Sequence, residues 1–219
     1  MQKVLLKTGK IIYPNSLKIS KPLKVAIIGS GKMAEEYSKV VTSFNHKIKI
    51  FISKSHSKNS IVLSKKYNSL VSNKISDISP KEIDLIIICS SWDNLYGDLS
   101  SCLKTKKPIL VEKSIILSRS RLKKIFKHKS RIFFAYNRNY YDFVNFILNF
   151  FKKNNPKLIR LSIYDSYKKI VKNKGKKIQN YLPVYITSHW ISFVYFLLKK
   201  LDYNLDFKKK FNLKNNSFS

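Results

Sequence analysis

Residues 24–34, Lys-Val-Ala-Ile-Ile-Gly-Ser-Gly-Lys-Met-Ala, decide the fold of this chain. The apolar run at 25–28 predicts a buried strand, and the glycines after it predict a tight turn into a helix. The turn has the pattern G-x-G-x-x-A. Small residues there let the chain turn sharply, let the backbone approach a pyrophosphate and let the helix pack on the sheet. We therefore expect dinucleotide contacts from Gly29, Ser30, Gly31, Lys32 and Met33, with a ligand-free turn as the alternative.

Apolar runs and helical segments alternate outward from this stretch, up to residue 136. Strands are predicted at 24–28, 47–52, 84–89, 108–111 and 131–136, with a short one opening near Val71. Helices are predicted at 32–44, 58–68, 94–105 and 119–128, the last capped by Ser118. This alternation is typical of βαβ units. It predicts an α/β fold, a doubly wound Rossmann-type parallel sheet with helices on both faces, over residues 23–136.

The regular alternation of apolar runs and helical segments ends after residue 136, and the pattern that follows predicts a truncated α+β second domain at 137–201. Its elements would be an aromatic helix that ends at Asn154-Asn155-Pro156, a strand at 158–164, a basic loop at 166–180 and a helix at 185–200. Residues 1–22 are predicted to be an extension with a hairpin around Tyr13-Pro14-Asn15. Residues 202–219 are predicted to be a basic tail. The aromatic faces of the small domain predict self-association as a homo-oligomer.

Composition excludes several classes of protein. The 219 residues are 44% hydrophobic and 13% aromatic, which excludes a disordered chain. No apolar run approaches the roughly 18–20 residues of a membrane span, and we see no secretory signal. The two cysteines, Cys89 and Cys102, make no disulfide framework and have no neighbouring ligands at metal-site spacing. We therefore expect a cytoplasmic protein in which both cysteines pack in the core and no metal is bound.

The net charge of +32, from 44 Lys+Arg against 12 Asp+Glu, raises the hypothesis of nucleic-acid binding. Lysine, however, greatly outnumbers arginine and is spread along the chain instead of forming one stripe. A dispersed, solvated surface charge explains this pattern better, so we predict no nucleic-acid partner. A field this positive still attracts phosphorylated cofactors.

The end of the second predicted strand bears on the choice of cofactor. NAD sites usually carry an acidic residue there for the ribose hydroxyls. Here the sequence is Ser53-Lys54-Ser55, which offers a hydroxyl and a cation. Ser53 and Lys54 therefore favour NADP(H), with NAD(H) as the alternative.

Four further segments carry a family resemblance. They are the strand at 85–89 followed by Ser90-Ser91, the segment 108–114 with Glu112-Lys113-Ser114, Tyr136-Asn137-Arg138, and the helix with Tyr185 and His189. Together with the glycine turn they resemble the Gfo/Idh/MocA oxidoreductases, the family of glucose–fructose oxidoreductase and inositol dehydrogenase. The usual tripeptide of that family, Glu-Lys-Pro, has serine in its third place here.

The resemblance implies an NAD(P)-dependent oxidoreductase of carbohydrate metabolism, acting on a sugar, a sugar nucleotide or a similar hydroxy or carbonyl compound. Lys113 would polarise the reacting oxygen, and Tyr185 or His189 would move the proton. Glu112 and Lys113 would hold the nicotinamide end of the cofactor. Arg138 and His189 would contact the substrate, and the loop along the cofactor would be formed by Ser90, Ser91 and Trp92.

Alternatives stay open for several of these residues. Many members of the family carry an acidic residue at the position of Tyr185. The alternative for Tyr185 is that it packs as an aromatic residue of the core. His189 suits helix packing, and Arg138 suits an ion pair with Asp142 four residues on. The short second domain raises an alternative function, a catalytically inactive dinucleotide sensor or a subunit of a larger assembly.

Overall fold

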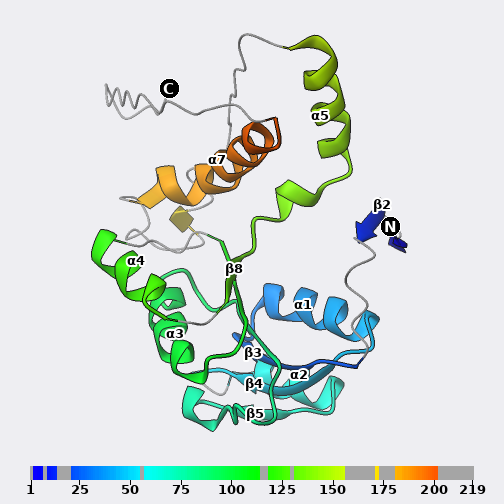
Figure 1. Ribbon diagram of the computed structural model, residues 1–219. Helices are drawn as coiled ribbons and strands as arrows, with labels where there is room; N and C mark the ends of the chain where they lie inside the picture. The colour runs from blue at the N-terminus through cyan, green and yellow to red at the C-terminus, as the bar shows by residue number, and fades with distance from the viewer. Residues whose placement is uncertain are drawn as a thin grey trace.

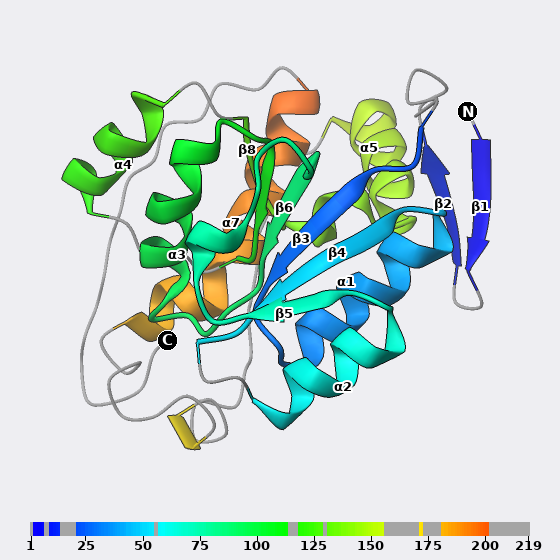
Figure 2. The same cartoon turned by 90° about the horizontal axis from the view of Figure 1, so that it is seen from below.

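A six-stranded parallel sheet forms the centre of the computed structural model, which describes residues 2–6, 9–13, 21–54, 57–113, 118–128, 131–155, 171–172 and 181–201. The strands lie in the order β5-β4-β3-β6-β7-β8 (Figure 2). Their bounds are Lys24–Ile28 (β3), Lys47–Ile52 (β4), Leu70–Ser72 (β5), Leu85–Ile88 (β6), Ile109–Val111 (β7) and Ile132–Phe134 (β8). The order reverses between β3 and β6, so the predicted doubly wound Rossmann-type sheet is confirmed.

Helices cover both faces of this sheet region, residues 24–134 (Figure 2). One face carries α1 (Lys32–Ser43) and α2 (Lys58–Lys66), and the other carries α3 (Leu95–Cys102) and α4 (Arg119–Phe126). Single 3-10 turns lie at Ile75–Asp77 (η1) and Leu103–Thr105 (η2). Ser118 caps α4 as predicted, because its hydroxyl accepts a hydrogen bond from the Arg121 N–H.

Alternation along β3 explains why the sheet buries both faces. Val25 and Ile27 belong to the core under α1 and α2, whereas Ala26 and Ile28 belong to the core under α3 and α4. Successive side chains of a strand point to opposite faces, and a run that is apolar throughout therefore fills two cores. Cys89 and Cys102 are free and buried, as predicted.

The helical region, residues 137–154 and 181–201, follows β8. It contains a 3-10 turn at Asn137–Tyr140 (η3), α5 (Phe143–Asn154) and α7 (Leu182–Lys200). Figure 1 shows α5 and α7 set apart from the sheet, with η3 leading from β8 toward them. Asn155 ends α5 in a left-handed conformation with φ 43°. The predicted strand at 158–164, most of the predicted basic loop at 166–180 and the tail at 202–219 lie outside the described residues.

A separate antiparallel hairpin precedes the sheet region. It pairs β1 (Gln2–Leu6) with β2 (Gly9–Tyr13) in a register that joins Leu6 to Gly9 and Gln2 to Tyr13. The hairpin prediction around Tyr13-Pro14-Asn15 was therefore wrong in position. The pairing shows that the chain reverses direction between Leu6 and Gly9, and it places Tyr13 opposite Gln2 at the open end of the hairpin.

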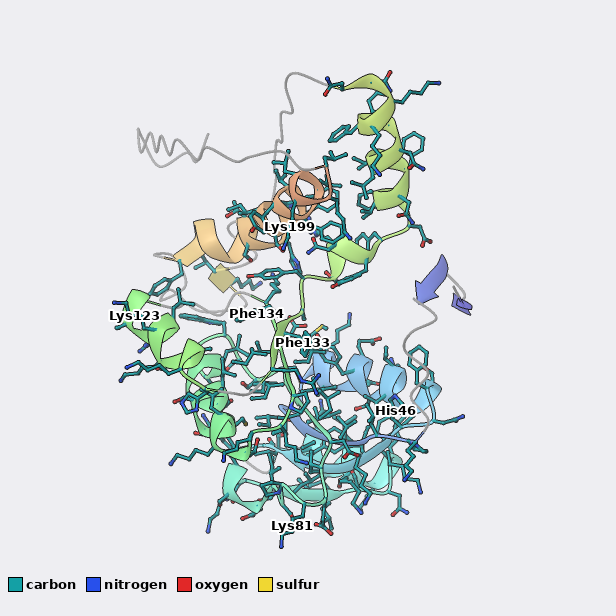
Figure 3. The ribbon with its side chains drawn as sticks, viewed as in Figure 1. His46, Lys81, Lys123, Phe133, Phe134 and Lys199 are labelled. Atoms are coloured by element: carbon teal, nitrogen blue, oxygen red, sulfur yellow. The ribbon has the colours of Figure 1, made fainter. Side chains whose placement is uncertain are left out.

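Exposed lysines come from well-separated parts of the molecule. Lys81 lies in a loop, Lys123 on α4 and Lys199 on α7, and Figure 3 labels all three at different places. None of the helices in the described ranges is both long and apolar enough to cross a membrane.

Candidate functional site

The turn between β3 and α1 leaves its backbone accessible to a ligand. Gly29 has φ +123°, and a Cβ there would lie 2.8 Å from the Cys89 carbonyl oxygen, so only glycine fits. A Cβ at Gly31 would meet nothing within 4 Å, so this backbone faces open space at the amino end of α1. Ala34 is fully buried one turn later. The turn therefore leaves N–H groups of the first helical turn open to an anion.

A cavity of about 630 Å³ opens at this turn, where the parallel strands β3, β4, β6 and β7 end. Every residue predicted to bind the cofactor lines it, namely Gly29, Ser30, Gly31, Lys32, Met33, Ser53, Lys54, Ser90, Ser91, Trp92, Glu112 and Lys113. The carboxyl ends of parallel strands at a switch point in strand order are where such sheets bind ligands. The structure thus brings together four segments that are far apart in the sequence, one after each of these strands.

Three serine hydroxyls gather on one side of the cavity. The Ser30 Oγ lies 2.8 Å from the Ser57 Oγ and 3.2 Å from the Ser53 Oγ. The Asn59 amide donates to the Ser30 carbonyl at 2.9 Å, which holds the turn in place. Ser53 is thereby tied into a hydroxyl cluster beside the glycine turn.

Lys54 leaves the end of β4 and reaches across to α3. Its Nζ lies 3.1 Å from the Asp98 Oδ1 and donates to the Asn94 Oδ1 at 3.1 Å. Asp98 is only 2% exposed and also lines the cavity. A buried carboxylate is costly unless it is paired, and Lys54 supplies the pairing charge. The cation expected to meet a 2′-phosphate therefore has a carboxylate partner of its own.

Glu112 is fixed at the opposite end of the cavity. Its Oε1 accepts a hydrogen bond from the Tyr37 hydroxyl at 2.6 Å, and its Oε2 accepts one from the Lys113 N–H at 3.1 Å. Burial, reinforced by Glu112, raises the pKa of Tyr37, so Tyr37 stays a hydrogen-bond donor. Two hydrogen bonds thus position the Glu112 carboxylate after β7, directly beside Lys113.

His189 lies on α7 with its ring edge-on to Tyr136, at 6.0 Å between ring centroids. Burial, with the charges of Lys113 and Arg138, lowers the pKa of His189 to about 4. The imidazole is therefore neutral at pH 7. Its Nδ1 is buried and has no hydrogen-bond partner in the part of the chain that the structure describes.

Arg138 lies on η3, and its guanidinium stacks on the Trp190 ring at 3.7 Å. The alternative ion pair with Asp142 does not occur among the described residues. Stacking on an aromatic ring of α7 takes its place and joins η3 to that helix. Tyr185 belongs to α7 by its backbone, and its side chain lies outside the described part of the chain.

Sequence reasoning missed Tyr37 and Asp98. Tyr37 follows the buried Ala34 by one helical turn, a spacing that places it on the sheet side of α1. On α3, the buried residues Leu95, Asp98, Leu99 and Cys102 follow helical spacing. An acidic residue on the apolar face of a helix indicates a paired buried charge, and this signal was available from the sequence.

The cavity suits a dinucleotide better than a metal. The open backbone at Gly31, the Ser90 hydroxyl that is buried without a described partner, and the hydroxyl cluster all suit phosphate and sugar oxygens. Over the described residues, no three His, Cys, Asp or Glu side chains gather as a metal site would require. Lys113 lines the cavity, whereas Arg138 and His189 are not among its described lining residues. The charges of Lys113 and Arg138 nevertheless act on His189 and help to lower its pKa.

The sequence matches one family model, GFO_IDH_MocA, described as an oxidoreductase family with an NAD-binding Rossmann fold. The match covers residues 23–135, slightly more than half of the chain. No curated protein sequence matches the chain significantly.

Several solved structures share the fold. A probable dehydrogenase from Thermotoga maritima has a TM-score of 0.64 at 12% identity, over 81% of this chain and 55% of its own. A putative myo-inositol dehydrogenase from Sinorhizobium meliloti 1021 gives 0.62 at 16% identity, over 81% and 55%. GenD2 from gentamicin A biosynthesis, in complex with NAD, gives 0.57 at 13% identity, over 64% and 41%. The chain thus spans about half the length of these structures, and the likeness is one of fold.

Proposed function

The chain belongs to the Gfo/Idh/MocA family of oxidoreductases, and from this membership we propose that it is an NAD(P)-dependent oxidoreductase. Its reaction would move a hydride to or from a carbon that bears a hydroxyl or carbonyl group. The observation that carries the proposal is that the open Gly31 backbone and Lys113 line the same cavity, at the carboxyl ends of four strands.

The residues divide into a phosphate end and a reacting end. Gly29–Met33 would bind the pyrophosphate, and Ser90, Ser91 and Trp92 would line the cofactor along its length. A bound nicotinamide supplies the hydride donor or acceptor. Glu112, held by Tyr37, would fix the position of the nicotinamide end and of the Lys113 backbone.

Lys113 and His189 would act on the substrate oxygen. The Lys113 ammonium stabilises the negative charge that develops on this oxygen during hydride transfer. His189, neutral at pH 7, can accept a proton or a hydrogen bond from the substrate hydroxyl. Arg138, stacked on Trp190, would contact the substrate, and Tyr185 stays a candidate for the proton transfer.

The finer assignments are also proposals. We infer a sugar, sugar nucleotide or similar small polyol as the substrate, and NADP(H) as the favoured cofactor because Lys54 lines the cavity. We further propose a cytoplasmic homo-oligomer. Exposed aromatic side chains on α5 support the self-association.

A matched pair of variants tests the reaction. Lys113→Met should lower turnover about 10²- to 10⁴-fold on any substrate found in a panel of aldoses, inositols and uronates, because it removes the charge at the reacting oxygen. The dissociation constant for NADPH should change less than about threefold, since the pyrophosphate contacts stay intact. Lys104→Met, at an exposed position on η2, is the control and should leave both quantities unchanged. Unchanged turnover in Lys113→Met would contradict the proposed role.

A second candidate function rests on two departures from the family pattern, the serine at 114 in place of the proline of Glu-Lys-Pro and the tyrosine at 185 in place of an acidic residue. A dinucleotide-binding sensor or subunit would bind cofactor with the same residues and show no turnover. Tight NADPH binding, no turnover across the panel, and a partner whose binding depends on the cofactor would favour this alternative.

A further inference from the structure

Asp98 is a charged side chain that the proposed reaction does not use. It is 2% exposed, lies on the apolar face of α3 and lines the cavity. Its Oδ1 forms an ion pair with the Lys54 Nζ at 3.1 Å, whereas its Oδ2 is buried and has no hydrogen-bond partner in the described ranges. Burying a carboxylate in this way costs stability, so we looked for a role of Asp98 at the cavity.

Lys54, the partner of Asp98, is the residue that would distinguish NADP(H) from NAD(H). Lys54 follows β4, and the Lys54 side chain is 59% exposed, so it can meet a ligand in the cavity. The contacts to Asp98 and Asn94 draw its Nζ toward α3. The positive charge of Lys54 is therefore offset by a carboxylate about 3 Å away, before any ligand arrives.

We propose that Asp98 is a cofactor-specificity residue, whose pairing with Lys54 weakens recognition of a 2′-phosphate and keeps the 2′-hydroxyl form of the cofactor competitive. This inference rests on the proposed dinucleotide function. A 2′-phosphate is a dianion that gains from Lys54 and loses from the negative charge beside it. A 2′-hydroxyl is uncharged and is nearly indifferent to that carboxylate.

Asp98→Asn tests the direction of the effect. Asparagine keeps the size of the side chain and an acceptor oxygen for Lys54, and Asn94 still holds the ammonium. The negative charge is removed, and an amide NH₂ takes the place of one carboxylate oxygen. NADPH affinity should therefore rise about five- to tenfold, while NADH affinity should stay within about twofold.

The experiment titrates NADH and NADPH by nicotinamide fluorescence at about 0.2 M salt, which screens the general surface charge. The proteins are the unchanged chain, Asp98→Asn, Lys54→Gln and the double variant. Glu82→Gln is the control, because it makes the same change in net charge at an exposed loop position outside the cavity lining. Lys54→Gln should shift the NADPH-to-NADH ratio a few-fold toward NADH, and the double variant should match Lys54→Gln within about twofold.

The outcomes separate the inference from the function that it rests on. An unchanged ratio in Asp98→Asn, or a loss of NADPH affinity, overturns the specificity role, because it would mean that Asp98 merely positions Lys54 or does nothing. A gain that persists in the double variant also overturns it, since the effect would then not pass through Lys54. If Asp98→Asn does not fold, an unchanged ratio in Lys54→Gln overturns it. Failure of the unchanged chain to bind either dinucleotide would instead refute the proposed function.

Discussion

The sheet region and the helical region differ in how they bury apolar surface. In the sheet region, two cores fill both faces of a six-stranded sheet, and fully buried side chains such as Phe51 and Leu99 are common. In the helical region, the described core consists of Val144, Phe193 and Leu197 with partly buried neighbours. Aromatic side chains there stay in solvent, as Tyr140 at 77% and Phe146 at 72% exposure show.

This difference has a functional meaning. Every described residue that lines the cavity belongs to the sheet region. Backbone hydrogen bonds hold the strand ends there, such as the one from the Gly29 N–H to the Ile52 carbonyl at 2.9 Å. The helical region supplies Arg138 and His189, which would face the substrate. Under the proposed function, cofactor binding would rest on a closed core, whereas substrate contacts would rest on helices with a small core.

The largest effects should come from removing one phenylalanine in each region. Phe51→Ala, in the core under α1 and α2, should lower the free energy of unfolding by about 4 kcal/mol. Phe193→Ala should cost about 2 kcal/mol, because its neighbours are partly exposed and can collapse into the space. Urea denaturation gives both values, and hydrogen exchange should place the loss in Phe193→Ala in α5 and α7 alone. Equal, global losses would remove the contrast between the regions.

The glycine turn should separate stability from binding. Gly29→Ala should cost about 3 kcal/mol, from left-handed strain and a Cβ 2.8 Å from the Cys89 carbonyl oxygen. Gly31→Ala should cost less than about 1 kcal/mol, because its Cβ meets no protein atom within 4 Å. It should nevertheless weaken dinucleotide binding about tenfold or more by blocking the approach of the pyrophosphate. Calorimetric unfolding and cofactor titration measure the two effects, and Gly31→Ala with normal binding would contradict this assignment.

His189 should make the helical region sensitive to acid. Burial lowers its folded pKa to about 4, below the ordinary value near 6.5, so the unfolded chain binds more protons between these two pH values. Stability should therefore fall as pH drops from 6.5 toward 4. Over this pH range, the free energy of unfolding of His189→Gln should fall by about 1 kcal/mol less than that of the unchanged chain. The difference is modest because the ring is only half-buried. Urea midpoints at pH 7 and pH 5 measure it, and parallel losses in both proteins would count against the buried neutral imidazole.

The smallest effect on stability should come from the exposed face of α5. Phe146→Gln should change the free energy of unfolding by less than about 0.5 kcal/mol, since the ring is mostly in solvent. If this face takes part in self-association, the same variant should reduce the mass of the oligomer in sedimentation velocity. A monomeric unchanged chain would contradict the predicted homo-oligomer.

Local patterns predicted the sheet region well and the N-terminal hairpin less well. Apolar runs bounded by glycine, proline or charge located every strand of the sheet to within about two residues, because a parallel strand buried on both faces needs such a run. The hairpin turn was misplaced because Tyr13-Pro14-Asn15 carries strong turn residues, whereas the pairing from Gln2 to Tyr13 uses a short connection earlier in the chain.

The sequence predicted which segments form the site, but it did not predict the side-chain contacts between these segments. The residues at strand ends follow from topology, since parallel strands end at one edge. The Lys54–Asp98 pair and the Tyr37–Glu112 hydrogen bond join residues 44 and 75 positions apart, and no local pattern specifies their geometry. Arg138 stacks on Trp190 instead of pairing with Asp142, and a contact between residues 52 positions apart is one that four-residue helical spacing cannot predict.

The most direct measurement is a fluorescence titration of the unchanged chain and Gly31→Ala with NADH and NADPH at about 0.2 M salt. Inorganic pyrophosphate and a short RNA serve as competitors that share only the negative charge. The account predicts saturable binding of at least one dinucleotide that neither competitor displaces and that Gly31→Ala weakens about tenfold or more. Binding that both polyanions displace, that fades with salt and that Gly31→Ala leaves unchanged would contradict the dinucleotide site.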